Sequence, residues 1–214
     1  MALPSSFKER IKDLAGIAYN DNDATNADDS ALQQFLTDGC YDVVFRIGSV
    51  SPDAISRFTS KTTSTSWTNG TQMDSYREIL QVYRNSVRCN TGKSRYHDSY
   101  GNTQSIHYAH SENPVWYMFN GGLYVMPAPG SLSVDLYYLP DYDIDIDTNS
   151  IINFPKSYHE HIALYAAIRV LDYRIQEVVE EDEDSEMMAL LRAQQQKLQA
   201  DYEAKFAIQS GGRR

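Results

Sequence analysis

The histidines of the run His159-Glu160-His161 are the residues whose type most readily suggests metal chemistry. A metalloprotease helix places two histidines at i and i+4, so that both lie on one face and reach one zinc ion. Here the spacing is i and i+2, which turns the two side chains about 200° apart on a helix. The two histidines therefore do not share an ion, and we predict that both are surface residues of the first helical turn.

A second pair of histidines, His107 and His110, is separated by three positions. The flanking residues predict a strand here, and on a strand this spacing sends the two side chains to opposite faces. We therefore expect ordinary side chains at a sheet edge rather than a metal site.

Four aspartates alternate with apolar residues between Asp141 and Asp147. A calcium-binding loop requires glycine at its sixth position and a carboxylate at its twelfth. Counted from Asp141, those positions hold Ile146 and Ile152, so an EF-hand is excluded. The alternation predicts an extended segment with one acidic and one apolar face, in which the charges protect a sheet edge. A looser cation site is the alternative.

Nucleophilic chemistry finds little support in the sequence. Cys40 and Cys89 are the only cysteines, too few for a disulfide scaffold or a thiolate zinc site. Cys40 falls within a helical apolar stripe, where we expect a small buried residue rather than a nucleophile. A phosphate-binding loop, a dinucleotide fingerprint and a nucleophile elbow are all missing from the sequence. We therefore predict a protein that is not an enzyme and that has no cofactor and no metal.

One cluster combines basic and aromatic residues at a spacing compatible with phosphate contacts. We interpret it as a solvated sheet face or a subunit contact, with phosphate binding as the alternative. Its members are Tyr83, Arg84, Arg88, Lys93, Arg95 and Tyr96.

The charge balance argues against an electrostatic attraction to nucleic acid or to anionic lipid. The 214 residues include 19 Lys and Arg against 29 Asp and Glu, a formal charge of −10, and most of the excess lies after residue 140. Hydrophobic residues make up 42% of the chain, which is typical of a globular protein, and the 16 tyrosines suit protein–protein contacts. We see no membrane-spanning run and no signal peptide, and expect no membrane association and no export.

Helical periodicity marks both ends of the chain. Ser6 to Glu9 fits a capping box that starts a first helix, and a second helix begins near Ser30 and ends with Gly48 as its C-cap. Ser51-Pro52 starts one more short turn. Two further helices follow Pro155, separated by an acidic loop over 180–186. The residues predicted to lie in the core of these helices are Val43, Val44, Ile162, Ile168 and Leu171.

The middle of the chain reads as short strands separated by Gly, Asn and Pro. Asn120-Gly121-Gly122 suits a hairpin turn, because glycine tolerates the positive φ that such turns require. No segment long enough for a crossover helix separates the strands, so we predict an antiparallel meander. Its strands are Ile79–Arg84, Ser105–Tyr108, Trp116–Phe119, Leu123–Met126 and Leu132–Leu139.

The apolar period changes from near 3.6 to 2 and back along the chain, which predicts an α+β fold. Its N- and C-terminal helices form one helical body with an inserted antiparallel β-sheet. We divide the chain into N-terminal helices over 1–58, a β region over 59–150, C-terminal helices over 151–209 and a flexible tail over 210–214.

Three stretches resemble the head-to-tail connector proteins of tailed bacteriophages, also called adaptor or neck proteins. Residues 113–129, which include Gly121-Gly122-Leu123-Tyr124-Val125-Met126-Pro127-Ala128-Pro129, are similar to that family's paired strands. Leu132–Pro140 resembles the strand that follows. Phe154–Ala167 resembles the family's proline-started helix with its alanine patch. The resemblance covers about residues 75–208, and the acidic run 180–186 and the spacer 20–29 depart from it.

The resemblance implies a structural virion protein of the neck, between capsid and tail, which is assembled in the host cytoplasm. It implies a ring of about twelve copies that joins the portal to the tail or tail nozzle, with DNA passing through without sequence-specific binding. Helices would pack the subunits together, and we assign this packing to Ala163, Ala166 and Ala167. A pair of helices within one chain explains these alanines equally well.

The resemblance also implies that the C-terminal segment reaches toward the portal. We expect the tail after the last helix to become ordered only on docking to the portal, through Ile208, Gln209, Arg213 and Arg214. A disordered end without a partner is the alternative. Two other functions stay open: a tail or baseplate component, structural or receptor-binding, and a small phage enzyme with an unrecognised site.

Overall fold

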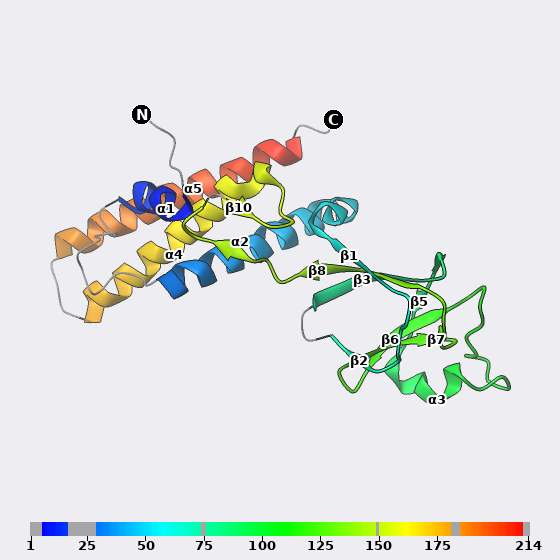
Figure 1. Ribbon diagram of the computed structural model, residues 1–214. Coiled ribbons are helices and arrows are strands. Elements are labelled where there is room, and N and C mark those ends of the chain that lie inside the picture. Colours follow the sequence, from blue (N-terminus) through cyan, green and yellow to red (C-terminus); the bar gives the residue numbers. More distant parts are fainter. Residues whose placement is uncertain (1–5, 17–28, 74–75, 149, 181–184, 212–214) are drawn as a thin grey trace. The chain divides into compact units, whose positions relative to one another are not determined.

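The computed structural model describes residues 6–16, 29–73, 76–148, 150–180 and 185–211 (Figure 1). The chain divides into two compact units. The helical unit consists of the chain up to Phe58 and from Tyr142 onward, and the β unit consists of Thr59–Asp141. The predicted α+β fold class is confirmed.

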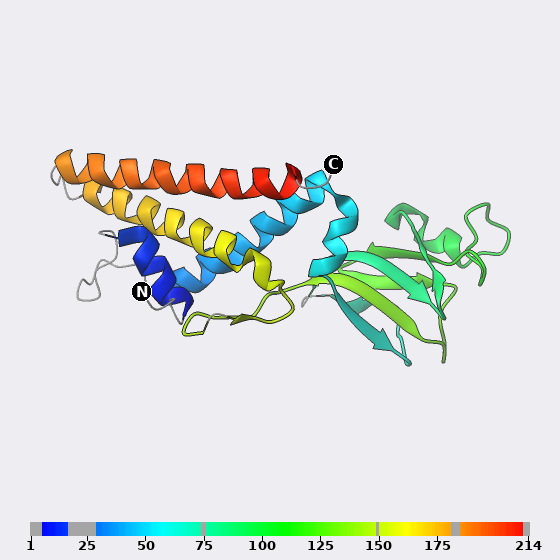
Figure 2. The same ribbon diagram turned by 90° about the horizontal axis from the view of Figure 1, so that it is seen from above.

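The helical unit is built around one central helix. Helix α4 (His159–Glu180) packs against α1 (Phe7–Ala15), α2 (Asp29–Val50) and α5 (Ser185–Gly211). Figure 2 shows α4 and α5 running side by side along their lengths. Because three helices surround α4, its first turns are buried on nearly every side. The five residues predicted to lie in the core, on α2 and α4, are all buried.

The ends of the helices follow local rules with one exception. Ser6 caps α1, since its hydroxyl accepts a hydrogen bond from the Glu9 amide at 3.1 Å. The predicted C-cap at Gly48 is wrong, because α2 continues to Val50. A Cβ at Gly48 would lie 2.7 Å from Cδ1 of Ile55, so glycine here allows close packing rather than a stop.

Short elements connect the long helices. The 3-10 helix η2 (Pro52–Phe58) starts with proline in its first position, as predicted, and η4 (Lys156–Tyr158) leads directly into α4. Strands β9 (Ile144–Asp145) and β10 (Ser150–Ile151) form a two-stranded antiparallel sheet. Tyr142 and Ile144 are buried while the aspartates beside them are exposed, so the predicted alternation is confirmed.

The β unit contains two four-stranded sheets. The first has the order β1-β8-β3-β4, and the second has the order β2-β7-β6-β5. Their bounds are β1 (Ser60–Ser64), β2 (Thr71–Gln72), β3 (Tyr76–Arg84), β4 (Val87–Arg88), β5 (Asn90–Thr91), β6 (Val115–Phe119), β7 (Gly122–Met126) and β8 (Val134–Pro140).

The predicted meander is wrong in its connectivity. Strand β8 pairs with both β1 and β3, which are distant in sequence, and β5 runs parallel to β6. The predicted strand Ser105–Tyr108 lies in turns, after η3 (Ser94–Tyr96) and the short helix α3 (His97–Tyr100). The predicted hairpin at Asn120-Gly121 is confirmed, because both residues have positive φ and join β6 to β7.

Side chains from both sheets share one apolar core in the β unit. Val82 of β3 and Leu136 of β8 meet Leu123 and Val125 of β7 there, together with Trp67 and Trp116. A second, aromatic cluster gathers near α3 around Tyr100 and Tyr117. Burial raises the pKa of Tyr117 to about 12, so its hydroxyl stays protonated next to Nδ1 of His97 at 2.9 Å.

Candidate interaction site

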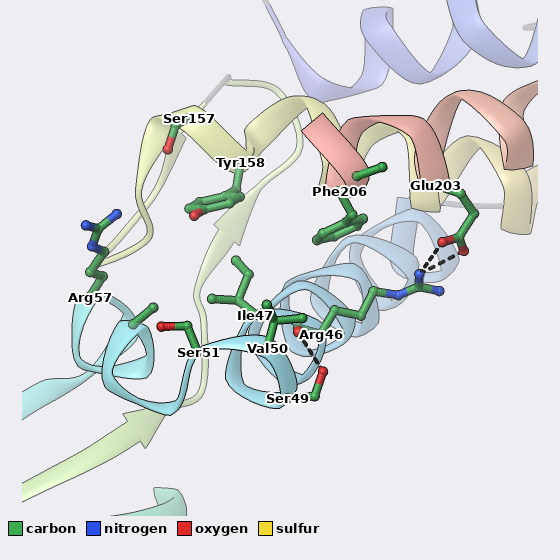
Figure 3. A pocket seen from close by; sticks show the side chains of 12 residues that line it. Arg46, Ile47, Ser49, Val50, Ser51, Arg57, Ser157, Tyr158, Glu203 and Phe206 are labelled. Atoms are coloured by element: carbon green, nitrogen blue, oxygen red, sulfur yellow. Dashed lines mark hydrogen bonds and ion pairs between the residues drawn. The ribbon is translucent and has the colours of Figure 1, made fainter. Parts of the chain in front are cut away.

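An open groove of about 870 Å³ lies at the end of the helical unit where α2, η2, η4 and α5 meet (Figure 3). We call it the end groove. Its apolar lining includes Ile47 and Val50 of α2, Tyr158 of η4 and Phe206 of α5. The aromatic ring of Phe206 lies 5.1 Å from that of Tyr202, which belongs to the same helix. Aromatic and aliphatic side chains in an open groove favour contact with a protein partner.

Two arginines supply the positive charge of the end groove, Arg46 and Arg57. Arg57 lies on η2, is exposed and forms no ion pair with any other described residue. Figure 3 shows its side chain at the opposite side of the groove from Glu203. Its guanidinium is available to a carboxylate of a binding partner.

The second arginine, Arg46, is held by contacts within the chain. One amino group lies 2.7 Å and 2.9 Å from the two carboxylate oxygens of Glu203, and Nε donates to Asp42 at 2.8 Å. The guanidinium carbon also lies 5.0 Å from the ring centre of Tyr202 and 5.3 Å from that of Phe206. These contacts join the end of α2 to the end of α5 and fix one wall of the groove.

A buried tyrosine completes this network. The hydroxyl of Tyr202 donates a hydrogen bond to Asp42, the same carboxylate that binds Arg46. Burial, together with this hydrogen bond, raises the pKa of Tyr202. The hydroxyl therefore stays protonated and continues to donate across the neutral pH range.

His159 and His161 are buried, so the prediction of surface residues is wrong. The ring of His159 lies 5.5 Å from that of Phe7 in α1, and the ring of His161 lies 4.8 Å from that of Phe206. They do point to different sides of α4, but neighbouring helices cover both sides. Burial, followed by the positive charge of Lys205, lowers the pKa of His161, so this ring is neutral beneath the end groove.

The family model of the SU10 adaptor protein matches residues 5–214 of the chain. The chain belongs to this family. It is therefore a structural adaptor protein of a phage, and the predicted membership in a head-to-tail adaptor family is confirmed. A search of curated proteins found no significant match. The groove has an apolar floor and arginines at its side, a combination that suits contact with a protein.

Other predicted sites of the adaptor have structural roles. Arg84, from the predicted basic cluster, is buried and donates from Nε to the carbonyl of Pro127 at 2.9 Å. Burial raises the pKa of both cysteine thiols, that of Cys89 to about 11. His107 stacks on Tyr96 at 3.9 Å within a loop, not at the predicted sheet edge.

Metal ligation and membrane insertion have no support among the described residues. No group of three His, Cys, Asp or Glu side chains there is arranged to hold a metal ion. No helix in the same part of the chain is both long and apolar enough to cross a bilayer.

The alanines assigned to subunit packing, Ala163, Ala166 and Ala167, are fully buried inside the helical unit of the adaptor. They lie on α4, where Gly39 of α2 also approaches closely, since a Cβ at Gly39 would lie 3.3 Å from Cγ2 of Ile162. This burial supports the alternative of helix packing within one chain, because it leaves these alanines no surface to offer a neighbouring subunit.

The predicted portal-docking residues lie at the end of the adaptor chain. The backbone of Ile208 and Gln209 belongs to α5, which continues to Gly211 instead of ending near Phe206. Arg213 and Arg214 lie outside the described residues. The segment beyond the helix is therefore shorter than the sequence suggested.

The end groove itself was missed by the sequence analysis. Its lining comes from three regions that are distant in sequence, around residues 46–57, 157–158 and 203–207. One sequence feature could have indicated that the histidines at the start of α4 are buried. The run 161–168 contains no Asp, Glu, Lys or Arg and is apolar on every side of the helix. Such a run is typical of a central helix, and it points to covered histidines at its start.

Proposed function

We propose that this adaptor forms a ring of about twelve copies in the neck of the virion, joining the portal to the tail and surrounding the path of the DNA. The observation that carries the proposal is the family match over residues 5–214. Assembly would take place in the host cytoplasm, and the ring would meet the portal on one side and a tail or nozzle protein on the other.

The distribution of charge supports a role in DNA passage. The helical unit holds 13 of the 19 Lys and Arg and 23 of the 29 Asp and Glu, so it carries the whole formal charge of −10. The β unit holds six of each and is neutral. An acidic surface repels the phosphate backbone, so duplex DNA would pass it without binding.

The C-terminal end of α5 is our proposed contact with the portal. Ile208 and Gln209 would contribute through the last helical turns, and Arg213 and Arg214 would pair with portal carboxylates. Two truncations separate these contributions, one after Gly211 and one after Ala207. We expect the first to weaken portal binding at low salt and the second to abolish it. Unchanged portal affinity after both truncations would contradict this contact.

The test of the proposed function is electron microscopy of the full-length protein, alone and mixed with purified portal from the same phage. We expect closed rings, or rings that form on the portal, and a native mass that is a multiple of 24.3 kDa. A protein that stays monomeric with and without portal would overturn the proposal. A gel-shift assay at low salt should find no binding to duplex DNA.

A tail or receptor-binding component is the second candidate, and one feature of the β unit favours it. Ile106, in the turns after α3, is 95% exposed, and Tyr108 nearby is also exposed. Exposed apolar side chains at a loop are suited to docking on another protein. A trimeric mass without affinity for portal would support this candidate over the ring.

A further inference from the structure

One large apolar side chain on α2 is left exposed. Phe45 is 77% exposed, although it lies well inside a 22-residue helix. With 100° of rotation per residue, Phe45 shares its side of α2 with Asp38 and Tyr41, while Ser49, 40° around the helix, lies at the edge of the end groove. An exposed phenylalanine offers a large apolar area that a partner can bury, and aromatic residues are enriched in protein interfaces. This side of α2 is therefore a candidate contact surface.

The end groove opens on another side of the same helix. Arg46, Ile47 and Val50 line the groove, and helical geometry turns Val50 about 140° away from Phe45. Val50 is itself 70% exposed, and Ala54 and Ala207 leave room because they lack longer side chains. The volume of about 870 Å³ accommodates an aromatic side chain together with its neighbours.

We infer that the end groove of one copy receives Phe45 of the next copy, and that this contact closes the ring. The inference rests on the proposed function. Neighbours in a cyclic ring of more than two copies meet through two different surfaces, each of which every copy must carry. Helix α2 carries both surfaces at the same level, the groove on one side and Phe45 on the other, so the same contact repeats from copy to copy.

The charges of the two surfaces are complementary. Arg57 offers a guanidinium without an ion pair among the described residues, and Asp38 lies two helical turns before Phe45 on the same side of α2. Oδ1 of Asp38 accepts a hydrogen bond from Gln34 at 2.8 Å. The phenylalanine would lie against the ring of Phe206 and near Arg46, a combination typical of interface cores.

The chain's own C-terminal tail suits the end groove less well. It ends in Arg213 and Arg214, which carry the same sign of charge as Arg57. A partner copy that brings Asp38 with Phe45 has the opposite sign. The alternative to a second copy is that the tail or a segment of the portal occupies the groove. The variants described next distinguish these occupants.

The test uses one variant of each surface in the full-length chain. Phe45→Asp removes the inserting side chain, and Ala207→Trp fills the groove at an exposed position. We expect each variant alone to be monomeric by native mass spectrometry, with at least a tenfold lower ring fraction than the wild type. Mixed together, they should form 1:1 dimers and no rings, because only one intact groove and one intact Phe45 can meet.

The matched control is Val179→Asp, which places the same charge at another exposed apolar position, 55% exposed, on α4. It should form rings like the wild type. Where wild-type rings form only on portal, the same comparison is made on portal. Normal rings from Phe45→Asp would overturn the inference and leave the proposed function intact. If Phe45→Asp or Ala207→Trp forms free rings and loses only portal binding, the inference is also overturned. The groove would then bind a segment of the portal.

A cross-linking experiment gives an independent result. A chain with both Asp38→Cys and Arg57→Cys keeps Phe45 and should, after oxidation, produce a ladder of covalent multimers up to the ring size. Each single cysteine variant should stop at dimers or below, since the native Cys40 and Cys89 are buried. The absence of a ladder from the double variant under conditions that give wild-type rings would contradict the inferred contact.

Discussion

The helical unit and the β unit differ in how the chain forms them and in their net charge. The helical unit is assembled from two segments separated by 83 residues of sequence, and it carries all of the net charge. The β unit is one continuous segment, is neutral, and is held by two sheets with a shared core. The net charge thus lies in one unit, and the other unit is a self-contained neutral insertion.

The two units can be observed separately in one unfolding experiment. Both tryptophans, Trp67 and Trp116, lie in the core of the β unit, so their fluorescence reports on that unit. The long helices dominate the circular dichroism and report on the helical unit.

The largest effect is expected from Ile162→Ala on the central helix. Ile162 is fully buried against Gly39 of α2, so its truncation leaves a cavity and should cost about 2–5 kcal/mol. In urea, the dichroism midpoint should fall while the fluorescence midpoint stays unchanged. The control is Ile152→Ala, at a position 60% exposed in the same unit. Coincident shifts of both signals would break the comparison, because the units would then unfold as one.

A smaller effect is expected from Arg84→Met in the β unit. The buried guanidinium binds the carbonyl oxygens of Pro127 and Ala128, which would lose their donor, at a cost of about 1–3 kcal/mol. In urea, the midpoint of the fluorescence transition should fall, and the midpoint of the dichroism transition should remain unchanged. Arg88→Met, at an exposed position of β4, is the matched control and should change little. Equal effects of the two substitutions would argue against a structural role for Arg84.

A pH-dependent effect is expected from His161. Burial lowers its pKa in the folded state below the ordinary value of 6.5, so the folded state binds the proton less readily than the unfolded chain. Stability should therefore be full above pH 6.5 and fall as the pH drops below that value. Dichroism-monitored unfolding between about pH 7.5 and 5 measures this loss.

The substitution His161→Phe should remove that part of the pH dependence, since it keeps an aromatic ring without a titrating group. His107→Gln in the β unit is the control and should keep the wild-type slope of the dichroism signal. If His161→Phe unfolded with the wild-type pH dependence, the loss would have to come from other groups.

The smallest effect is expected from Glu160→Gln. Glu160 and Lys205 form a partly exposed ion pair at 2.8 Å, and this hydrogen bond is the main cause that lowers the pKa of Glu160. Pairs of this kind contribute less than about 1 kcal/mol. The difference from the wild type in the dichroism midpoint should shrink at about 1 M salt, where screening is strong. A large, salt-independent loss would instead indicate a packing role for Glu160.

The sequence predicted the structure correctly where an apolar pattern extended over several helical turns, and where a turn depended only on neighbouring residues. The helical stripes placed Val43 and Leu171 in the core, and Asn120-Gly121 marked a hairpin by its positive φ requirement. What failed was the long-range pairing of strands. No local pattern in Ser60–Ser64 indicates that it pairs with β8, 70 to 78 residues later in the chain.

The histidines failed for a different reason. A spacing of i and i+2 correctly separates His159 and His161 around the helix, but it says nothing of how many neighbours the helix has. Because α1 covers one side and α5 another, both rings are buried. The end groove escaped prediction for the same reason, since it exists only where three distant segments meet.

The β unit leaves the helical unit and returns to it at neighbouring points. The hydroxyl of Tyr142 donates to the carbonyl of Phe58 at 3.0 Å, and Ser60 of β1 pairs with Tyr138 of β8. An insertion whose two ends lie this close can be exchanged or removed without stretching the host. A substitution of residues 59–141 by another insertion with close ends would therefore leave the helical unit intact. The β unit can therefore be replaced while the packing of α1, α2, α4 and α5 against one another is kept.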